Sequence, residues 1–133
     1  MATSFRSGTD LKRVRGLGAA RAGVHHWWVQ RATAAANLLL LIWFGASLVL
    51  LPDLSRATVI DWAASPLVAI PLILLTLSTI WHMRLGVQVM LEDYVPAEGT
   101  RRLLFLCLDF YAVAVAATSL FAILKIAFGA PDA

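Results

Sequence analysis

A single histidine, His82, lies deep within an apolar segment that ends on Glu92, Asp93 and Tyr94. The segment is long enough to cross a membrane. An ionisable ring inside a membrane span is costly to place there and marks a functional site by default. An imidazole binds metals or forms hydrogen bonds, and a carboxylate and a phenol at the end of the span form hydrogen bonds. The residues therefore indicate an intramembrane binding site and a polar group at the surface on one helix.

Small residues flank His82 on its own helical face. At about 100° per residue, Ser78 and Gly86 fall within roughly 40° of His82, one turn before and one turn after it. A porphyrin lying edge-on to the helix needs such clearance on both sides of its ligand. The same pattern fits a histidine that hydrogen-bonds a neighbouring helix, with the glycine serving helix packing. The residues alone leave both interpretations open.

One intramembrane histidine supplies only one of the two axial ligands of a bis-histidine haem. His25 and His26 stand near the entrance of the first apolar segment, whereas His82 lies about nine residues, some 13 Å, inside the end of the second. They are poorly placed as the opposite ligand, so that ligand must come from another chain or a second copy. Cys107 is the only cysteine, which excludes a multi-cysteine metal site.

The composition predicts the elements that must position these residues. The chain is 60% hydrophobic and 14% charged, against about 25% charged in a soluble domain. Three apolar blocks predict an all-α membrane protein, a single domain over residues 1–133, with transmembrane helices at about 29–51, 67–91 and 103–128. Residues 52–66 are expected to form a short loop and residues 95–102 a polar turn, and Pro71 is expected in the first turn or so of its helix.

The distribution of arginine predicts the topology. The N-terminal tail, residues 1–28, and the 95–102 turn are both arginine-rich, whereas residues 52–66 carry one arginine and two aspartates. The positive-inside rule then places the N-terminus in the cytoplasm and the C-terminus in the periplasm of a bacterial inner membrane, or the N-terminus in the matrix of a mitochondrion. The basic residues thus reflect membrane topology rather than nucleic-acid binding.

Two charges interrupt the second and third apolar segments at matching depth. Arg84 lies about 10 Å below Leu91, and Asp109 lies about 9 Å below Leu103 on the antiparallel third helix. An isolated charge at that depth is expensive. We therefore expect an ion pair between Arg84 and Asp109; the competing interpretation is that Arg84 extends to the basic side of the membrane.

Two motifs occur in order along this topology. The first comprises Gly23-Val24-His25 followed by Arg31-Ala32-Thr33, and the second comprises His82, Gly86, Asp93 and Tyr94. Together with the basic tail and the three spans, they resemble the hydrophobic membrane anchor of succinate dehydrogenase (respiratory complex II), of the type associated with cytochrome b556. The resemblance covers nearly the whole chain.

The resemblance implies roles for individual residues. His82 matches the axial ligand of haem b, with the other axial histidine supplied by a companion anchor subunit. Tyr94 matches the tyrosine that hydrogen-bonds a carbonyl oxygen of ubiquinone, and Asp93 is its neighbour in the motif. Arg31 matches an arginine near the haem propionates and the quinone pocket, and His25 matches a histidine on the quinone-side surface.

The resemblance also implies partners. These are an iron–sulfur subunit, a flavoprotein subunit that oxidises succinate, the second haem-binding anchor subunit and membrane lipid, with no nucleic acid. The chain itself has no flavin, iron–sulfur or dicarboxylate motif, so its expected work is docking, half of a haem b site and part of a ubiquinone site. A quinol:fumarate reductase anchor and a structural membrane subunit without cofactor are the alternatives. Relatives often have an acidic residue where this chain has His26.

Overall fold

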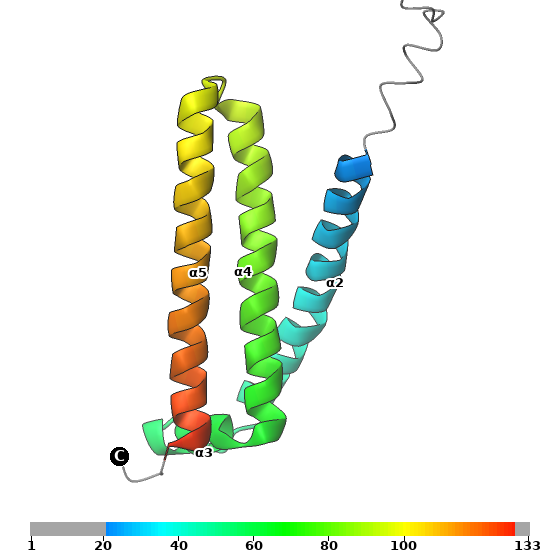
Figure 1. Cartoon of the computed structure of the whole chain (residues 1–133). Helices are drawn as coiled ribbons and strands as arrows, with labels where there is room; N and C mark the ends of the chain where they lie inside the picture. Colours follow the sequence, from blue (N-terminus) through cyan, green and yellow to red (C-terminus); the bar gives the residue numbers. More distant parts are fainter. Residues whose placement is uncertain (1–20, 130–133) are drawn as a thin grey trace, which may run out of the picture.

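The computed structural model describes residues 21–129, which form four helices (Figure 1). They are α2 (Arg21–Val49), α3 (Arg56–Ala64), α4 (Pro66–Tyr94) and α5 (Glu98–Phe128). Three of them, α2, α4 and α5, are long and apolar enough to cross a membrane. The predicted all-α fold with three transmembrane helices is confirmed.

The helix boundaries differ from those expected. α2 begins at Arg21, so residues 21–28 of the expected tail form its first turns, and residues 1–20 of that tail lie outside the described residues. The 95–102 turn is shorter than expected because α5 begins at Glu98. Pro71 lies inside α4, beyond its first turn, where its missing N–H removes a bond to the carbonyl of Leu67.

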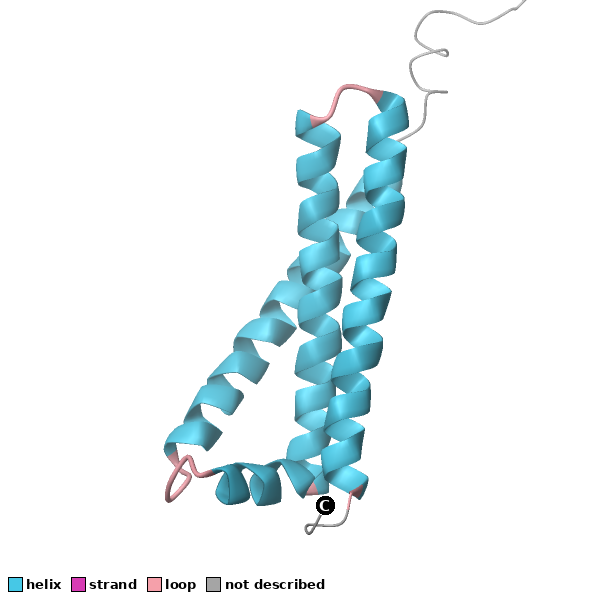
Figure 2. Cartoon of the chain, turned by 90° about the vertical axis from the view of Figure 1, so that its left-hand side faces the viewer, coloured by secondary structure: helices cyan, strands magenta, loops and turns pink. Residues whose placement is uncertain are grey.

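The expectation of a plain loop over residues 52–66 is wrong, because α3 occupies most of it. Ser55 starts this helix: its Oγ accepts the backbone N–H of Thr58 at 3.3 Å. The ring of Trp62 in α3 stacks on that of Trp43 in α2, with 6.4 Å between centroids. Figure 2 shows α3 lying across one end of the molecule, between the C-terminal end of α2 and the α4–α5 pair.

The three long helices are not equally close to one another. α4 and α5 run side by side and antiparallel, whereas α2 is inclined to them (Figures 1 and 2). The start of α2, the end of α4 and the start of α5 lie at the same end of the molecule. The polar 95–102 segment therefore lies at the same end as the start of α2, as the topology argument requires, while the side of the membrane on which this end lies stays a prediction.

Alanines account for three of the four buried apolar residues in the described part of the chain. The buried apolar residues in the described part of the chain are Ala63, Ala69, Leu85 and Ala112. Large apolar side chains point outward instead; Leu39 and Phe121 are each 70% exposed. Alanine at a helix contact lets two backbones approach closely, and leucine or phenylalanine outside it suits lipid or a partner helix.

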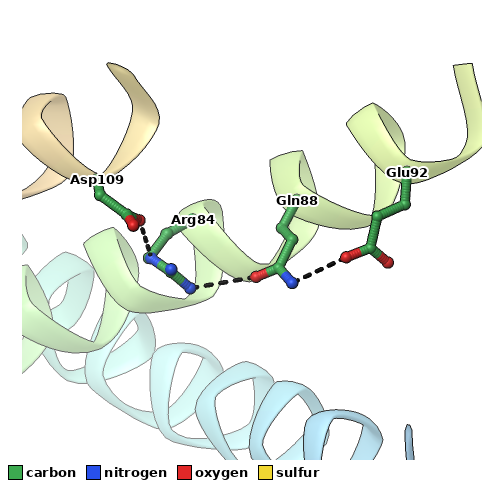
Figure 3. Close-up of polar contacts among 4 residues, drawn as sticks. All are labelled: Arg84, Gln88, Glu92 and Asp109. Carbon is green, nitrogen blue, oxygen red and sulfur yellow. Dashed lines mark hydrogen bonds and ion pairs between the residues drawn. The ribbon is translucent and has the colours of Figure 1, made fainter. Parts of the chain in front are cut away.

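An ion pair joins α4 to α5, as predicted. Arg84 Nε donates to Asp109 Oδ1 at 2.7 Å. Arg84 Nη1 also donates to Gln88 Oε1 at 3.2 Å, and Gln88 Nε2 donates to Glu92 Oε1 at 2.9 Å (Figure 3). A line of polar side chains therefore runs from the middle of α4 toward its C-terminal end and satisfies groups that lipid would leave without partners.

Gly86 packs α4 against α2. A Cβ at this position would lie 3.7 Å from Nε2 of Gln30, an ordinary van der Waals distance. The clearance expected beside His82 is therefore partly filled by the neighbouring helix of the same chain.

We predict that Asp109→Ala destabilises the protein by about 2.5–3.5 kcal/mol, because it leaves the Arg84 charge unpaired within the span. Arg84→Asp alone should also destabilise, and Arg84→Asp with Asp109→Arg should recover most of the loss. Thermal unfolding of the variants in detergent measures these changes in stability.

The exposed pair Arg102–Glu98 is the control, since its side chains are 79% and 71% exposed. Arg102→Ala should change stability by only about 0.3–0.5 kcal/mol. If Asp109→Ala, Arg84→Asp and the double reversal all lost the same amount of stability, the structural role of the Arg84–Asp109 pair would be refuted.

Substitution of Gly86 tests the α2–α4 contact. Gly86→Ala should be tolerated, because its Cβ meets only the flexible Gln30 side chain. Gly86→Leu should lower stability by about 1–3 kcal/mol by forcing the helices apart. Gly45→Leu is the matched control, because nothing lies within 4 Å of a Cβ there. A Gly86→Leu variant as stable as Gly45→Leu would contradict the contact.

Candidate functional site

Polar side chains concentrate where α2 contacts α4. Thr33 Oγ1 lies 3.0 Å from Nδ1 of His82. Ser78 Oγ donates to the carbonyl of Thr33 at 3.5 Å, and Thr79 Oγ1 donates to Oδ1 of Asn37 at 3.5 Å. Asn37 is buried, with 9% of its surface exposed. Within a membrane these groups need one another, because lipid offers them no hydrogen bonds.

The sequence left open that His82 hydrogen-bonds a neighbouring helix, and the structure shows such a bond, but the sequence analysis did not identify Thr33 as the partner. Thr33 and Asn37 interrupt the first apolar segment four residues apart, which places them on one face of α2. That spacing is the signal that was available. It identifies a polar face on α2 but does not by itself say which side chain of α4 meets it.

A pocket of about 360 Å³ opens beside this contact and brings Arg31 together with His82. Its other lining residues are His26, Trp27, Gln30, Ala34 and Val89. The Arg31 guanidinium lies over the ring of Trp27, 5.5 Å from its centroid. The pocket thus combines an imidazole, a cation and apolar walls, and its volume is at the small end of the about 300–1,000 Å³ usual for ligand sites.

His25 lies in a different pocket. It is about 120° from Arg31 around α2. It lines a pocket of about 490 Å³ together with Gln88 and Glu92 of α4. His26 lines both pockets, and its Nε2 is buried without a hydrogen-bond partner. The structure therefore places His25 and Arg31, which were expected near one site, in different pockets, and it keeps His25 out of the His82 pocket.

Asp93 and Tyr94 are the last two residues of α4. Both are exposed, Tyr94 to 81%, and neither lines the two pockets beside α2. They lie at the same end of the molecule as the start of α2, where Arg31 stands in its third turn. The structure does not bring Tyr94 and Arg31 into one pocket of this chain.

The pocket around His82 fits half of a haem site. Within residues 21–129 no group of three or more histidine, cysteine or acidic side chains comes together to hold a metal ion. His82 offers one imidazole, held at Nδ1 by Thr33, and Arg31 offers a cation suited to carboxylates. His26 is the other histidine that lines this pocket, while the resemblance to the family implies that the second axial imidazole comes from a companion subunit.

Comparison with known proteins agrees with this architecture. The family model described as "Succinate dehydrogenase/Fumarate reductase transmembrane subunit" matches residues 6–116. The chain is 29% identical over 114 residues to a succinate dehydrogenase hydrophobic membrane anchor subunit of Rickettsia bellii, which covers 85% of this chain and 89% of that protein.

A protein of the same description from Paracoccus denitrificans is 26% identical over 122 residues, 92% of this chain and 94% of its own length. The family model spans most of the chain, and the three apolar helices agree with a transmembrane subunit. The chain belongs to the family of succinate dehydrogenase/fumarate reductase transmembrane subunits.

Proposed function

We propose that this chain is a membrane-anchor subunit of succinate:ubiquinone oxidoreductase that provides half of a haem b site and part of a ubiquinone site. The observation that carries the proposal is that His82 and Arg31 line one pocket between α2 and α4. Family membership and the named relatives supply the class of complex. Dehydrogenation of succinate belongs to other subunits.

His82 would ligate the haem iron through Nε2, and Arg31 would stand near the propionates, where a cation stabilises carboxylates. Bound haem supplies one-electron transfer. A second anchor subunit would provide the opposite histidine and cover the open side of the pocket. An iron–sulfur subunit would dock at the end where α2 starts and α4 ends, with the flavoprotein subunit beyond it.

Tyr94 would donate its phenolic O–H to a carbonyl oxygen of ubiquinone, with Asp93 beside it. Reduction of a quinone by two electrons takes up two protons, so a site at the membrane surface with His25, Asp93 and Tyr94 in reach of water suits the reaction. The high exposure of Tyr94 fits a side chain whose pocket is completed by other subunits.

We further propose a bacterial inner membrane, with the N-terminus in the cytoplasm and the C-terminus in the periplasm. The excess of arginine at one end of the helices supports this orientation. An anchor of a quinol:fumarate reductase would use the same residues in the reverse direction, and the family includes both kinds of subunit.

A structural subunit without cofactor is the second candidate, and two contacts within this chain favour it. His82 already has a hydrogen-bond partner in Thr33, and Gly86 packs on Gln30, so both residues have a role within this chain. The hydrogen bond engages only Nδ1, however, and a ligand needs only Nε2. The two candidates therefore differ in one observable property, the haem spectrum of the complex.

We predict that His82→Ala abolishes the b-type band in the reduced-minus-oxidised spectrum of the purified complex, while the subunits still co-purify. His25→Ala is the matched control and should keep the band, because His25 lies in the other pocket. A full b-type band in His82→Ala would refute the role of His82 as a haem ligand and would favour a purely structural role for this residue.

We predict that Tyr94→Phe lowers succinate–ubiquinone reductase activity by about tenfold, the worth of one hydrogen bond. Succinate oxidation by an artificial acceptor that draws electrons from the catalytic subunits should be unchanged. Tyr111→Phe, on an exposed part of α5, is the control and should have no effect. Wild-type quinone reduction and inhibitor sensitivity in Tyr94→Phe would refute the role of Tyr94.

A further inference from the structure

The hydroxyl of Thr33 lies within hydrogen-bond distance of three groups. These are the carbonyl of Val29 at 2.9 Å, the carbonyl of Gln30 at 3.1 Å and Nδ1 of His82 at 3.0 Å. Both carbonyls belong to the helix that carries Thr33, and carbonyls only accept. Since a hydroxyl has one proton and two lone pairs, it serves one carbonyl as donor and remains free to accept from Nδ1.

This arrangement favours one tautomer of His82. When Thr33 donates to its own helix, Nδ1 must carry the proton in order to bond Oγ1, and Nε2 keeps its lone pair. The opposite tautomer would put the proton on Nε2 and remove its ability to bind a metal. Within the span, an Nδ1–H without an acceptor would also cost free energy, because lipid accepts no hydrogen bond.

We infer that Thr33 is a positioning residue for His82: its hydroxyl accepts from Nδ1–H, which holds the ring in the tautomer and orientation that present Nε2 to a haem iron. The inference rests on the proposed function. Metal-binding histidines commonly donate their second N–H to an acceptor, which fixes the ring and raises its basicity.

Thr33 is itself held firmly in place. Its β-branched side chain is stiff at χ1, and its hydroxyl is anchored to the backbone three and four residues earlier. Its carbonyl accepts from Ser78 Oγ, one turn before His82 on the same face of α4. The hydroxyl therefore lies at a defined point on the α2–α4 contact rather than on a mobile side chain.

The test is a redox titration of the haem in the complete complex carrying Thr33→Val, Thr33→Ala or Thr33→Ser. Thr33→Val keeps the branched shape of the side chain and removes the hydroxyl. Thr33→Ala removes both the branch and the hydroxyl, whereas Thr33→Ser keeps the hydroxyl. Without an acceptor, the His82 ring donates less electron density and stabilises ferric iron less. The midpoint potential should rise in Val and Ala, by about 59 mV for a tenfold loss of ferric preference. Ser should stay near wild type.

Thr118→Val is the matched control. Thr118 makes the same two bonds within its helix, to the carbonyls of Ala114 at 2.9 Å and Val115 at 3.1 Å, and its side chain is exposed on α5. This variant should leave the potential unchanged. Electron paramagnetic resonance of the ferric haem provides a second readout, because the signal of low-spin iron should change when the ring is freer to rotate in Val and Ala.

The outcomes separate this inference from the proposed function. A raised potential, or loss of haem with the complex assembled, in Val and Ala but not in Ser supports the role of Thr33. An unchanged midpoint potential and an unchanged resonance signal in Thr33→Val and Thr33→Ala overturn the inference. It is also overturned if Thr33→Ser changes as much as these two variants, or if the complex fails to assemble in both of them. If instead His82→Ala retains the b-type band, the proposed function itself fails.

Discussion

The polar contact between α2 and α4 is the interaction on which the rest of this structure depends. The contact between the two helices joins five polar residues: Thr33, Asn37, Ser78, Thr79 and His82. The outer surfaces of both helices are apolar. Because lipid cannot hydrogen-bond them, these groups restrict how α2 and α4 can lie against each other. That restriction also fixes where the His82 ring points and which pocket it lines.

α4 carries a second polar line on a different face. Arg84 is about 200° from His82 around the helix and turns toward Asp109 on α5. The same helix therefore binds α2 through neutral hydrogen bonds and α5 through an ion pair. This division gives α4 the central place among the three long helices, because α4 contacts both α2 and α5.

The sequence predicted those features that depend on length and depth along a helix. The three spans followed from the lengths of apolar runs, and the Arg84–Asp109 pair followed from equal depths on two antiparallel helices joined by a short turn. The partner of His82 did not follow, because it depends on the rotation and inclination of α2. That geometry is set partly by α3, which was not expected within a stretch bounded by Pro52 and Pro66. The role of Tyr94 was predicted only from the resemblance of its motif to the anchor family. Its own spacing could not predict the role, because the proposed quinone pocket requires other chains.

A density map of the assembled complex, resolved well enough to show side chains around His82, tests the central claim most directly. The account predicts haem density between Nε2 of His82 and a histidine of a second anchor subunit, with Nδ1 still about 3 Å from Oγ1 of Thr33 and Arg31 toward the propionates. A map with only side chains or lipid facing Nε2 of His82, or with haem bound by histidines of other chains, would contradict it.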